Sequence, residues 1–292
     1  LDIKSKGSNV YFATENGVFT QGFKNSSLIQ LTQKSAKSIE IVKQTLYVGR
    51  HDGWLDSYQI KNEKLTRGLH VLLSPILNNS INSITRDKEK LWLATRNGIF
   101  VINHAGEVLE RHIHQSTNLK SLADNIVLSL LIDVKNNYWF GTDSGGINYL
   151  SQTAKLFGHI NQYSYSDAPL KNDDVRYFSP DDQGRMWLAT SIGAYIYDNE
   201  QFQKIEYYYP ALQLLERTFI TTILFTQGDV WFTTLDHGVV RYNFASQIST
   251  LFSPEHKNAP SLNYNMSTVY RDEILFGSPA IIAIDLFIKN FY

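Results

Sequence analysis

The sequence predicts an all-β protein, a seven-bladed β-propeller of four-stranded antiparallel blades. One phrase recurs seven times: an apolar strand around an aromatic or leucine residue, a small residue, a turn that usually contains Gly, and a second apolar strand. The copies are anchored near residues 11, 47, 92, 139, 187, 231 and 275, so successive steps are 36, 45, 47, 48, 44 and 44 residues. A self-similar period in the forties with mostly β repeats is typical of a propeller.

The length and composition fit one repeat array. The chain has 292 residues, of which 43% are hydrophobic and 19% charged, and its 17 Tyr, 16 Phe and 5 Trp suit strands packed face to face. We therefore predict a single propeller domain over residues 1–292. Propellers can close by letting strands from both termini share one blade, which removes a bare sheet edge. We accordingly expect 286–292 to lie beside the strands of the first blade.

The elements follow from apolar runs separated by turn residues. The first copy has only 1–5 as an innermost strand. In the fourth copy the predicted strands are 126–133, 138–142, 146–150 and 155–160. In the fifth they are 175–178, 186–190, 194–197 and 202–205, and the sixth copy repeats the pattern from residue 219. The strand 126–133 is nearly all apolar, as expected for an innermost strand that is packed on both faces.

An Asp stands six residues before the Trp in the fourth and fifth copies. The pairs are Asp133 with Trp139 and Asp181 with Trp187. The spacing suits an Asp that accepts hydrogen bonds from backbone N–H groups of the first hairpin. The Trp is predicted to pin its strand to the adjacent blade.

Candidate ligand contacts lie in turns that differ from copy to copy while the flanking strands repeat. In a propeller, the turns between second and third strands share one mouth with the connections between blades, and four of those connections are long: 114–125, 161–174, 207–217 and 253–265. Long loops on a rigid scaffold tend to carry function. We predict that a small molecule binds at this mouth. The candidate residues are Arg50, His51, Asp52, Arg96, Asn97, Asp143, Asp236 and His237, with Tyr163 and Tyr264 as rings for stacking.

Several classes are disfavoured by composition. The net charge is -1, from 27 basic and 28 acidic residues, so nothing indicates nucleic-acid binding. There is no Cys, which removes disulfides, thiolate nucleophiles and Cys-ligated zinc. The longest apolar run, 280–288, carries Asp285 and is too short to span a bilayer. The chain reads as a processed or excised segment, with membrane attachment only through segments outside it.

The sequence also offers few catalytic or metal-binding patterns. Arg50, His51 and Asp52 are consecutive turn residues whose side chains point in different directions. His112 and His114 share one side of a strand, yet no third metal ligand accompanies them. We therefore expect no metal, no cofactor and no enzyme activity in this segment. Two alternatives stay open: a propeller lyase or hydrolase, for which Asp143 and Asp236 would be the carboxylates, and a protein-interaction scaffold.

The repeats resemble those of the two-component regulator propeller family. The unit is most complete at Ser121-Leu122-Ala123-Asp124-Asn125-Ile126-Val127, followed by Asp133 and by Trp139-Phe140-Gly141-Thr142. It returns in part at Asp173-Asp174-Val175 with Trp187-Leu188-Ala189-Thr190, and at Ser261-Leu262-Asn263 with Phe276-Gly277. The chain departs from the family at Tyr11, Tyr47 and Leu275, which replace the Trp.

This resemblance implies a location and a role. It implies a seven-bladed propeller in the periplasmic sensor region of a bacterial membrane-bound signalling protein. The output domain would be a histidine kinase or a diguanylate cyclase elsewhere in that protein. Ligands in the family are often carbohydrate breakdown products, so an oligosaccharide is the expected kind of small molecule. The expected partners are the other domains of the same receptor and, as one assembly, a second copy in a homodimer.

Overall fold

A computed structural model gives the fold. It describes residues 2–7, 9–22, 25–61, 64–73, 79–151, 157–161, 170, 172, 174–199, 201–226, 228–253, 266–270, 273–277 and 285–287. The chain divides into two compact units, Leu1–Phe140 with Leu150–Phe157, and Gly141–Tyr149 with Gly158–Tyr292. Each unit is described by itself, and the prediction of one domain over 1–292 stays a prediction.

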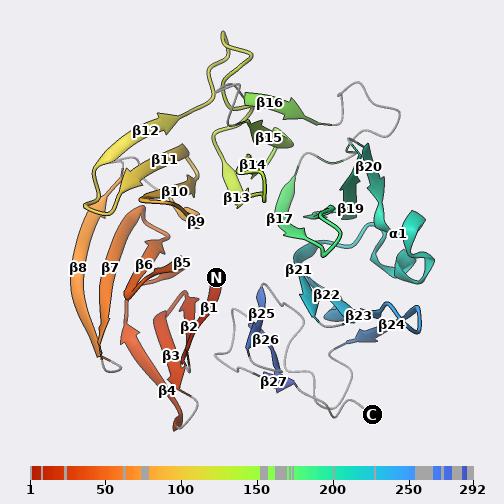
Figure 1. Cartoon of the computed structure of the whole chain (residues 1–292), viewed down its shortest axis with the longest axis horizontal. Coiled ribbons are helices and arrows are strands. Elements are labelled where there is room, and N and C mark those ends of the chain that lie inside the picture. Colours follow the sequence, from red (N-terminus) through yellow and green to blue (C-terminus); the bar gives the residue numbers. More distant parts are fainter. Residues whose placement is uncertain are drawn as a thin grey trace. The chain divides into compact units, whose positions relative to one another are not determined.

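The blades are antiparallel sheets whose strands follow chain order (Figure 1). The first blade is β1 (Asp2–Lys6), β2 (Asn9–Thr14), β3 (Gly17–Gly22) and β4 (Asn25–Thr32). The second is β5 (Ala36–Val42), β6 (Thr45–Arg50), β7 (Trp54–Lys61) and β8 (Lys64–Leu72). The third is β9 (Ile81–Asp87), β10 (Lys90–Thr95), β11 (Gly98–Asn103) and β12 (Val108–His112). The fourth is β13 (Val127–Ile132), β14 (Tyr138–Thr142), β15 (Ile147–Leu150) and β16 (Phe157–Ile160).

The remaining blades include the one helical insert of the described residues. The fifth blade is β17 (Val175–Pro180), β18 (Met186–Thr190), β19 (Gly193–Asp198) and β20 (Gln201–Lys204). It is followed by α1 (Ile205–Tyr208) and the 3-10 helix η1 (Pro210–Leu215). The sixth blade is β21 (Ile220–Thr226), β22 (Asp229–Thr234), β23 (Val239–Asn243) and β24 (Ile248–Phe252). The last sheet is β25 (Met266–Tyr270), β26 (Glu273–Gly277) and β27 (Asp285–Phe287).

The propeller architecture with four-stranded antiparallel blades is confirmed, but the number of such blades is not seven. Six sheets have four strands, and the described part of the seventh repeat has three. In the described part of this repeat, β26 is followed by β27 alone, whereas in each four-stranded blade two strands follow the second one. The predicted sharing of a blade by the termini is also wrong for the described strands. β1 pairs with β2 and completes the first blade, whereas β27 pairs with β26; residues 288–292 lie outside the described part.

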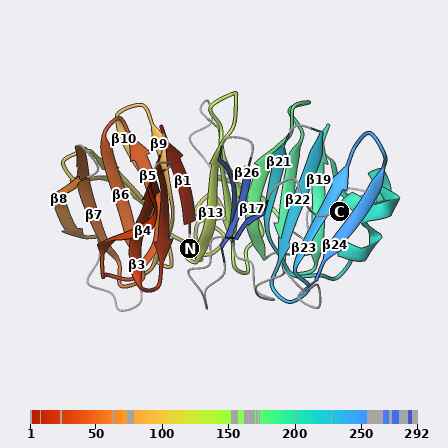
Figure 2. The same cartoon turned by 90° about the horizontal axis from the view of Figure 1, so that it is seen from below.

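Packing between blades forms the core of each unit. Innermost strands lie side by side, β1 with β5 and β5 with β9 in the first unit, β17 with β21 in the second (Figure 2). Aromatic rings fill the layers between blades: Trp92 of β10 stacks on Tyr138 of the next blade at 4.2 Å between ring centroids. Trp187 meets Phe225 edge-on at 5.0 Å and is fully buried. The predicted role of this Trp, to pin one blade to the next, is confirmed.

The hairpin role of the Asp residues is confirmed as well. Asp133 accepts backbone N–H bonds from Lys135 and Asn137, both at 2.8 Å. Its second oxygen also accepts the indole N–H of Trp139 at 3.0 Å, a contact that the spacing alone did not predict. Burial raises the pKa of Asp133, but these hydrogen bonds outweigh burial and leave the pKa below its ordinary value of 3.8.

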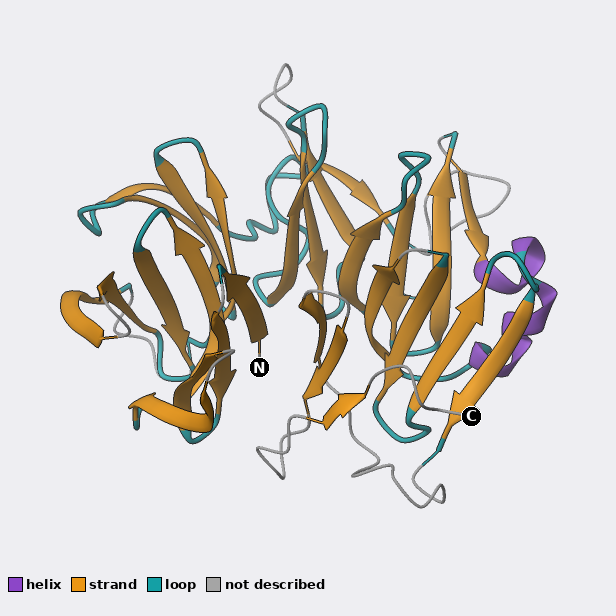
Figure 3. Cartoon of the chain, turned by 60° about the horizontal axis from the view of Figure 1, so that its bottom comes forward, coloured by secondary structure: helices purple, strands orange, loops and turns teal. Residues whose placement is uncertain are grey.

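The fifth blade repeats this arrangement. Asp181 accepts backbone N–H bonds from Gln183 and Arg185 at 3.0 and 2.9 Å, and the indole N–H of Trp187 at 2.9 Å. The insert after β20, α1 and η1, lies against the outer part of the fifth and sixth blades, where Tyr209 packs on Trp187 (Figure 3). The prediction for 207–217 was a long connection without helices, because elements of 4 and 6 residues are too short for a helical period to be visible.

Candidate functional site at the loop end of the second and third blades

Turns and connections meet at one end of each blade, as predicted. In the third blade, the Arg96 backbone N–H in the β10–β11 turn donates to Ser80 O, just before β9, at 3.2 Å. In the sixth blade, Leu235 N donates to Phe219 O at 3.0 Å across the same kind of junction. We call this end of a blade, with its second turn and its incoming connection, the loop end.

Two residues at the start of β9 join the loop ends of the second and third blades. Asn79 lies against the β6–β7 turn: a Cβ on Gly53, whose φ is +85°, would come within 2.9 Å of Asn79 O. Ser80 contacts the β10–β11 turn through the hydrogen bond to Arg96. Asn79 is 1% exposed and Ser80 is 7% exposed. One short segment therefore brings two predicted turns together.

Buried polar atoms gather at this junction without hydrogen-bond partners among the described residues. They are His51 Nε2, Asn79 Oδ1 and Nδ2, Ser80 Oγ and Asn97 Nδ2. We call these four residues the loop-end cluster. A buried polar atom left unpaired costs about 1–3 kcal/mol, so a group of them does not serve the stability of the fold. Donors and acceptors of this kind are what a polar ligand would satisfy.

The ionisation of His51 fits a neutral polar site. Burial lowers the pKa of the His51 imidazole, and the Lys37 ammonium lowers it further. The imidazole is therefore neutral at pH 7 and offers one donor and one acceptor nitrogen. Asn79 adds an amide and Ser80 a hydroxyl, so the cluster consists of uncharged donors and acceptors.

Predicted residues of the second and third blades are only partly brought together. His51 and Asn97 belong to the loop-end cluster, and Arg96 is exposed beside it. Arg50, however, turns its guanidinium to Asp52 and to Asp56 of β7, with Nη1 to Asp56 Oδ2 at 3.4 Å. Arg50 and Asp52 therefore contact each other, contrary to the expectation that all three side chains diverge, while His51 belongs to the loop-end cluster.

The predicted residues of the second unit are paired separately. Asp143 lies 3.6 Å from Arg176 Nη2. Asp236 accepts from the neighbouring His237 Nδ1 at 2.6 Å, and both side chains are more than half exposed. The structure gives no contact between the two carboxylates, so it adds nothing to the hydrolase alternative. Tyr163 and Tyr264 lie outside the described residues.

The two strand histidines have separate partners. His112 stacks on Trp92 with ring centroids 5.9 Å apart, and burial lowers its pKa. His114 Nδ1 instead contacts Leu122 O at 2.7 Å. Across the part of the chain that the structure describes, no group of three or more His, Asp or Glu side chains has metal-binding geometry.

Asn79 and Ser80 were not predicted. They stand in the turn-like stretch before β9, outside the strand–turn phrase by which the repeats were aligned, so the spacing did not mark them. The one available signal was position: they directly precede an innermost strand, where the connections converge. A cavity of about 510 Å³ between the second blade and the β4–β5 connection was not predicted either; it is lined by Arg50, Trp54, Asp56, Tyr58, Arg67 and His70 with Thr32, Gln33 and Lys34.

Comparison with known proteins shows what the chain is similar to. No protein-family model matches the sequence. The chain is 26% identical over 300 residues to Histidine kinase P4 of Formosa agariphila, a match that covers 94% of this chain and 21% of that protein. The fold is similar to the crystal structure of the extracellular domain of the hybrid two-component system BT3049 from B. thetaiotaomicron. That match has a TM-score of 0.75 and 21% identity, and it covers 95% of this chain and 37% of that one.

These matches confirm the resemblance to sensor propellers. The sequence relative is named a histidine kinase, and the solved structure of similar fold is named the extracellular domain of a hybrid two-component system. A WD40 propeller domain of Doa1 shares the fold at a TM-score of 0.67 with 13% identity, covering 95% of this chain and 89% of that one. The chain spans 21% of the length of the histidine kinase. In the described part, no helix is long and apolar enough to cross a membrane.

Proposed function

We propose that this chain is the extracytoplasmic, periplasmic ligand-sensing segment of a bacterial membrane-bound receptor of the sensor-kinase type. A small molecule, for which an oligosaccharide is the leading candidate, binds at the loop end of the second and third blades. The segment itself is not an enzyme, and it passes the binding event to the other domains of its receptor. The similarity to Histidine kinase P4 and to the extracellular domain of BT3049 supports the receptor setting.

The loop-end cluster carries the proposal. Its uncharged polar atoms are buried, unpaired and drawn from three separate segments, an arrangement that costs stability unless a ligand fills it. A sugar presents hydroxyl groups that both donate and accept, which matches amide, hydroxyl and imidazole groups. A ligand transmits a signal only if it binds one receptor arrangement better than another. Because the blades are stiffly packed, we expect movement between the propeller and its partner domains.

Calorimetric titration of the chain with a panel of mono- and oligosaccharides tests the site. Asn79→Ala is the sharpest variant, because its amide makes no hydrogen bond in the described structure. It should leave the free energy of unfolding unchanged or raise it slightly, while weakening binding about tenfold or more. Asp182→Asn, an exposed change in the β17–β18 turn, is the control and should affect neither quantity. Binding that is untouched by Asn79→Ala, or silence across a broad panel, would overturn the proposed site or its sugar ligand respectively.

A further inference from the structure

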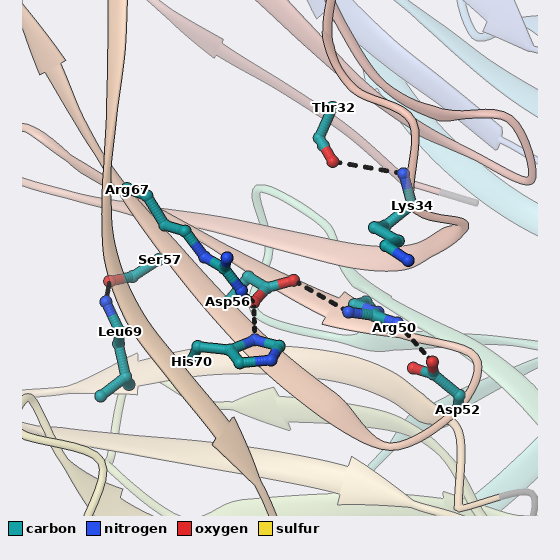
Figure 4. A network of polar contacts seen from close by, with 9 residues as sticks. All are labelled: Thr32, Lys34, Arg50, Asp52, Asp56, Ser57, Arg67, Leu69 and His70. Carbon is teal, nitrogen blue, oxygen red and sulfur yellow. Dashed lines mark hydrogen bonds and ion pairs between the residues drawn. The ribbon is translucent and has the colours of Figure 1, made fainter.

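Beside the β4–β5 connection, the second blade holds a buried carboxylate contacted by two arginines and a histidine. Asp56 of β7 is 2% exposed. Its Oδ1 accepts from His70 Nδ1 and lies 3.7 Å from Arg67 Nη2, and its Oδ2 lies 3.4 Å from Arg50 Nη1. Figure 4 shows these three side chains converging on Asp56 from β6 and β8. The carboxylate therefore fixes the positions of three nitrogen-bearing groups around one cavity.

A β-bulge places the two groups from β8 on the same face. Asp56 pairs with His70 but Tyr58 pairs with Arg67, so the register shifts by one residue between them. In a regular strand, residues three apart face opposite sides of the sheet. The bulge removes that alternation, and the hydrogen bond from Leu69 N to Ser57 Oγ at 2.8 Å holds it in place. The gathering of Arg67 and His70 over Asp56 is thus built into the backbone.

Charge around the cavity is not balanced by protein groups. Lys34, Arg50 and Arg67 contribute three positive charges, and the nearby carboxylates are Asp52 and Asp56. The Arg50 side chain is only 10% exposed, and its Nε is buried with no hydrogen-bond partner in the described part of the chain. The terminal nitrogens of Arg50 are bound to Asp56 and Asp52, so its Nε–H is the donor that still lacks an acceptor. An oxyanion supplies the missing charge and acceptor atoms.

A ring surface lines the same cavity. Trp54 stacks on His70 with centroids 4.0 Å apart and planes 6° from parallel, and Tyr58, four residues further along β7, lines the same cavity. Rings fixed in this way offer a flat apolar surface to a flat ligand. The volume of about 510 Å³ lies in the range of sites for small molecules.

We infer that this cavity is a second ligand site, which binds a small ring compound carrying a carboxylate or a sulfate. Arg50, Arg67 and Lys34 hold the oxyanion, and the stacked Trp54 and His70 carry the ring face. Asp56 and Ser57 are positioning residues that hold the arginines and the bulge. The inference stands on residues of the first two blades and does not depend on the loop-end cluster.

Nuclear magnetic resonance of the indole N–H groups tests this inference on the whole chain. The chain has five Trp, so the Trp54 signal is identified as the one missing in Trp54→Phe. The two acidic probes are glucuronate, whose uncharged match is glucose, and benzoate, whose uncharged match is benzyl alcohol. Inorganic sulfate is the fifth probe and tests an oxyanion without a ring. We expect a saturable shift of the Trp54 signal with one of the two acids and at least tenfold weaker binding of its uncharged match. Binding of glucuronate identifies the ring of the ligand as a sugar, and binding of benzoate identifies it as aromatic.

The variants Arg67→Gln and Lys34→Gln separate recognition from folding. Both head groups are exposed, so the fold should persist, while binding of the acid should weaken about three- to tenfold for each. Lys135→Gln, in the exposed β13–β14 turn, is the matched charge control and should have no effect. Three results would overturn the inference. The acid and its uncharged match could bind equally well, the Trp54 signal could stay unmoved with both acids and with sulfate, or Arg67→Gln could bind the acid as tightly as the natural chain does. Sulfate that binds as tightly as the ring acids would overturn the role of the ring surface.

Discussion

The second and fifth blades use a buried carboxylate in opposite ways. In the fifth, Asp181 receives backbone N–H groups, the Arg185 guanidinium and the Trp187 indole, all from its own hairpin. In the second, Asp56 receives only side chains, and one of them, Arg67, is 59% exposed beside a cavity. A carboxylate whose partners are local backbone groups fixes a strand turn. A carboxylate whose partners are side chains lining a cavity positions those side chains for recognition of a ligand.

The largest effect should come from the fifth blade. Trp187→Ala removes a fully buried ring between two blades and leaves Asp181 without its indole donor. We expect the free energy of unfolding to fall by about 3–5 kcal/mol, measured by chemical denaturation. Trp187→Phe keeps most of the ring and should cost clearly less. A loss below about 1 kcal/mol for the alanine variant would show that the fifth blade is not held in this way.

Asp56→Asn should be the next most damaging change. Removing one partner of a buried ion pair leaves Arg50 buried without a full counter-charge, which costs about 3 kcal/mol. Arg67→Gln, which removes an exposed partner of the same carboxylate, should change the free energy of unfolding by less than about 1 kcal/mol. Thermal and chemical denaturation of the two variants give the comparison. Equal losses would mean that the exposed arginine is as much a part of the fold as the buried one.

A third contrast lies in the small residue that ends the second strand of each blade. Gly49 of β6 stands where β18 has Ala189, and a Cβ on Gly49 would come within 2.5 Å of Ser38 Oγ and 2.6 Å of Ile81 Cγ2. We expect Gly49→Ala to lower the free energy of unfolding by about 1–3 kcal/mol through overpacking. The reverse change, Ala189→Gly, should cost only about 0.5–1 kcal/mol from added backbone freedom. If Gly49→Ala leaves the free energy of unfolding unchanged, the second and fifth blades have equal room for a Cβ at this position.

The smallest effect, and the one that depends on pH, concerns Asp133. Its pKa is lowered in the folded protein, so the stability that it contributes is present above the ordinary pKa and is lost as pH falls through the folded value. Asp133→Asn should therefore be less stable than the natural chain by about 1 kcal/mol at pH 7. The difference should shrink as the pH drops below 3.8. Urea denaturation over a pH series measures this, and a constant difference would contradict it.

Regular elements were predictable because their signals are local. The recurring phrase located β14 and β18 to the residue, and the Asp–Trp spacing predicted the hairpin contacts of Asp133 and Asp181. What escaped prediction depends on departures from regularity. The bulge at Arg67 to His70 breaks the two-residue alternation on which strand faces are assigned, so the ring of cations around Asp56 could not be seen.

Two of the four residues of the loop-end cluster were predicted, because only these two stand in the recurring turns. His51 and Asn97 stand in turns that recur, and variation among copies drew attention to them. Asn79 and Ser80 stand in a connection between blades, outside the recurring phrase, and they contact two separate turns. The predicted number of four-stranded blades was wrong at the seventh repeat, because the recurring phrase marks the second and third strands of a blade and carries no signal for the fourth.

Each complete blade is formed by one unbroken stretch of sequence, with its four strands in chain order. Duplication of a gene segment that encodes roughly 45 residues therefore adds a whole sheet with both of its packing faces. Later substitutions can change one repeat while the other repeats keep their original residues. Such a history allows the second blade to acquire new chemistry without disturbing the register of its neighbours.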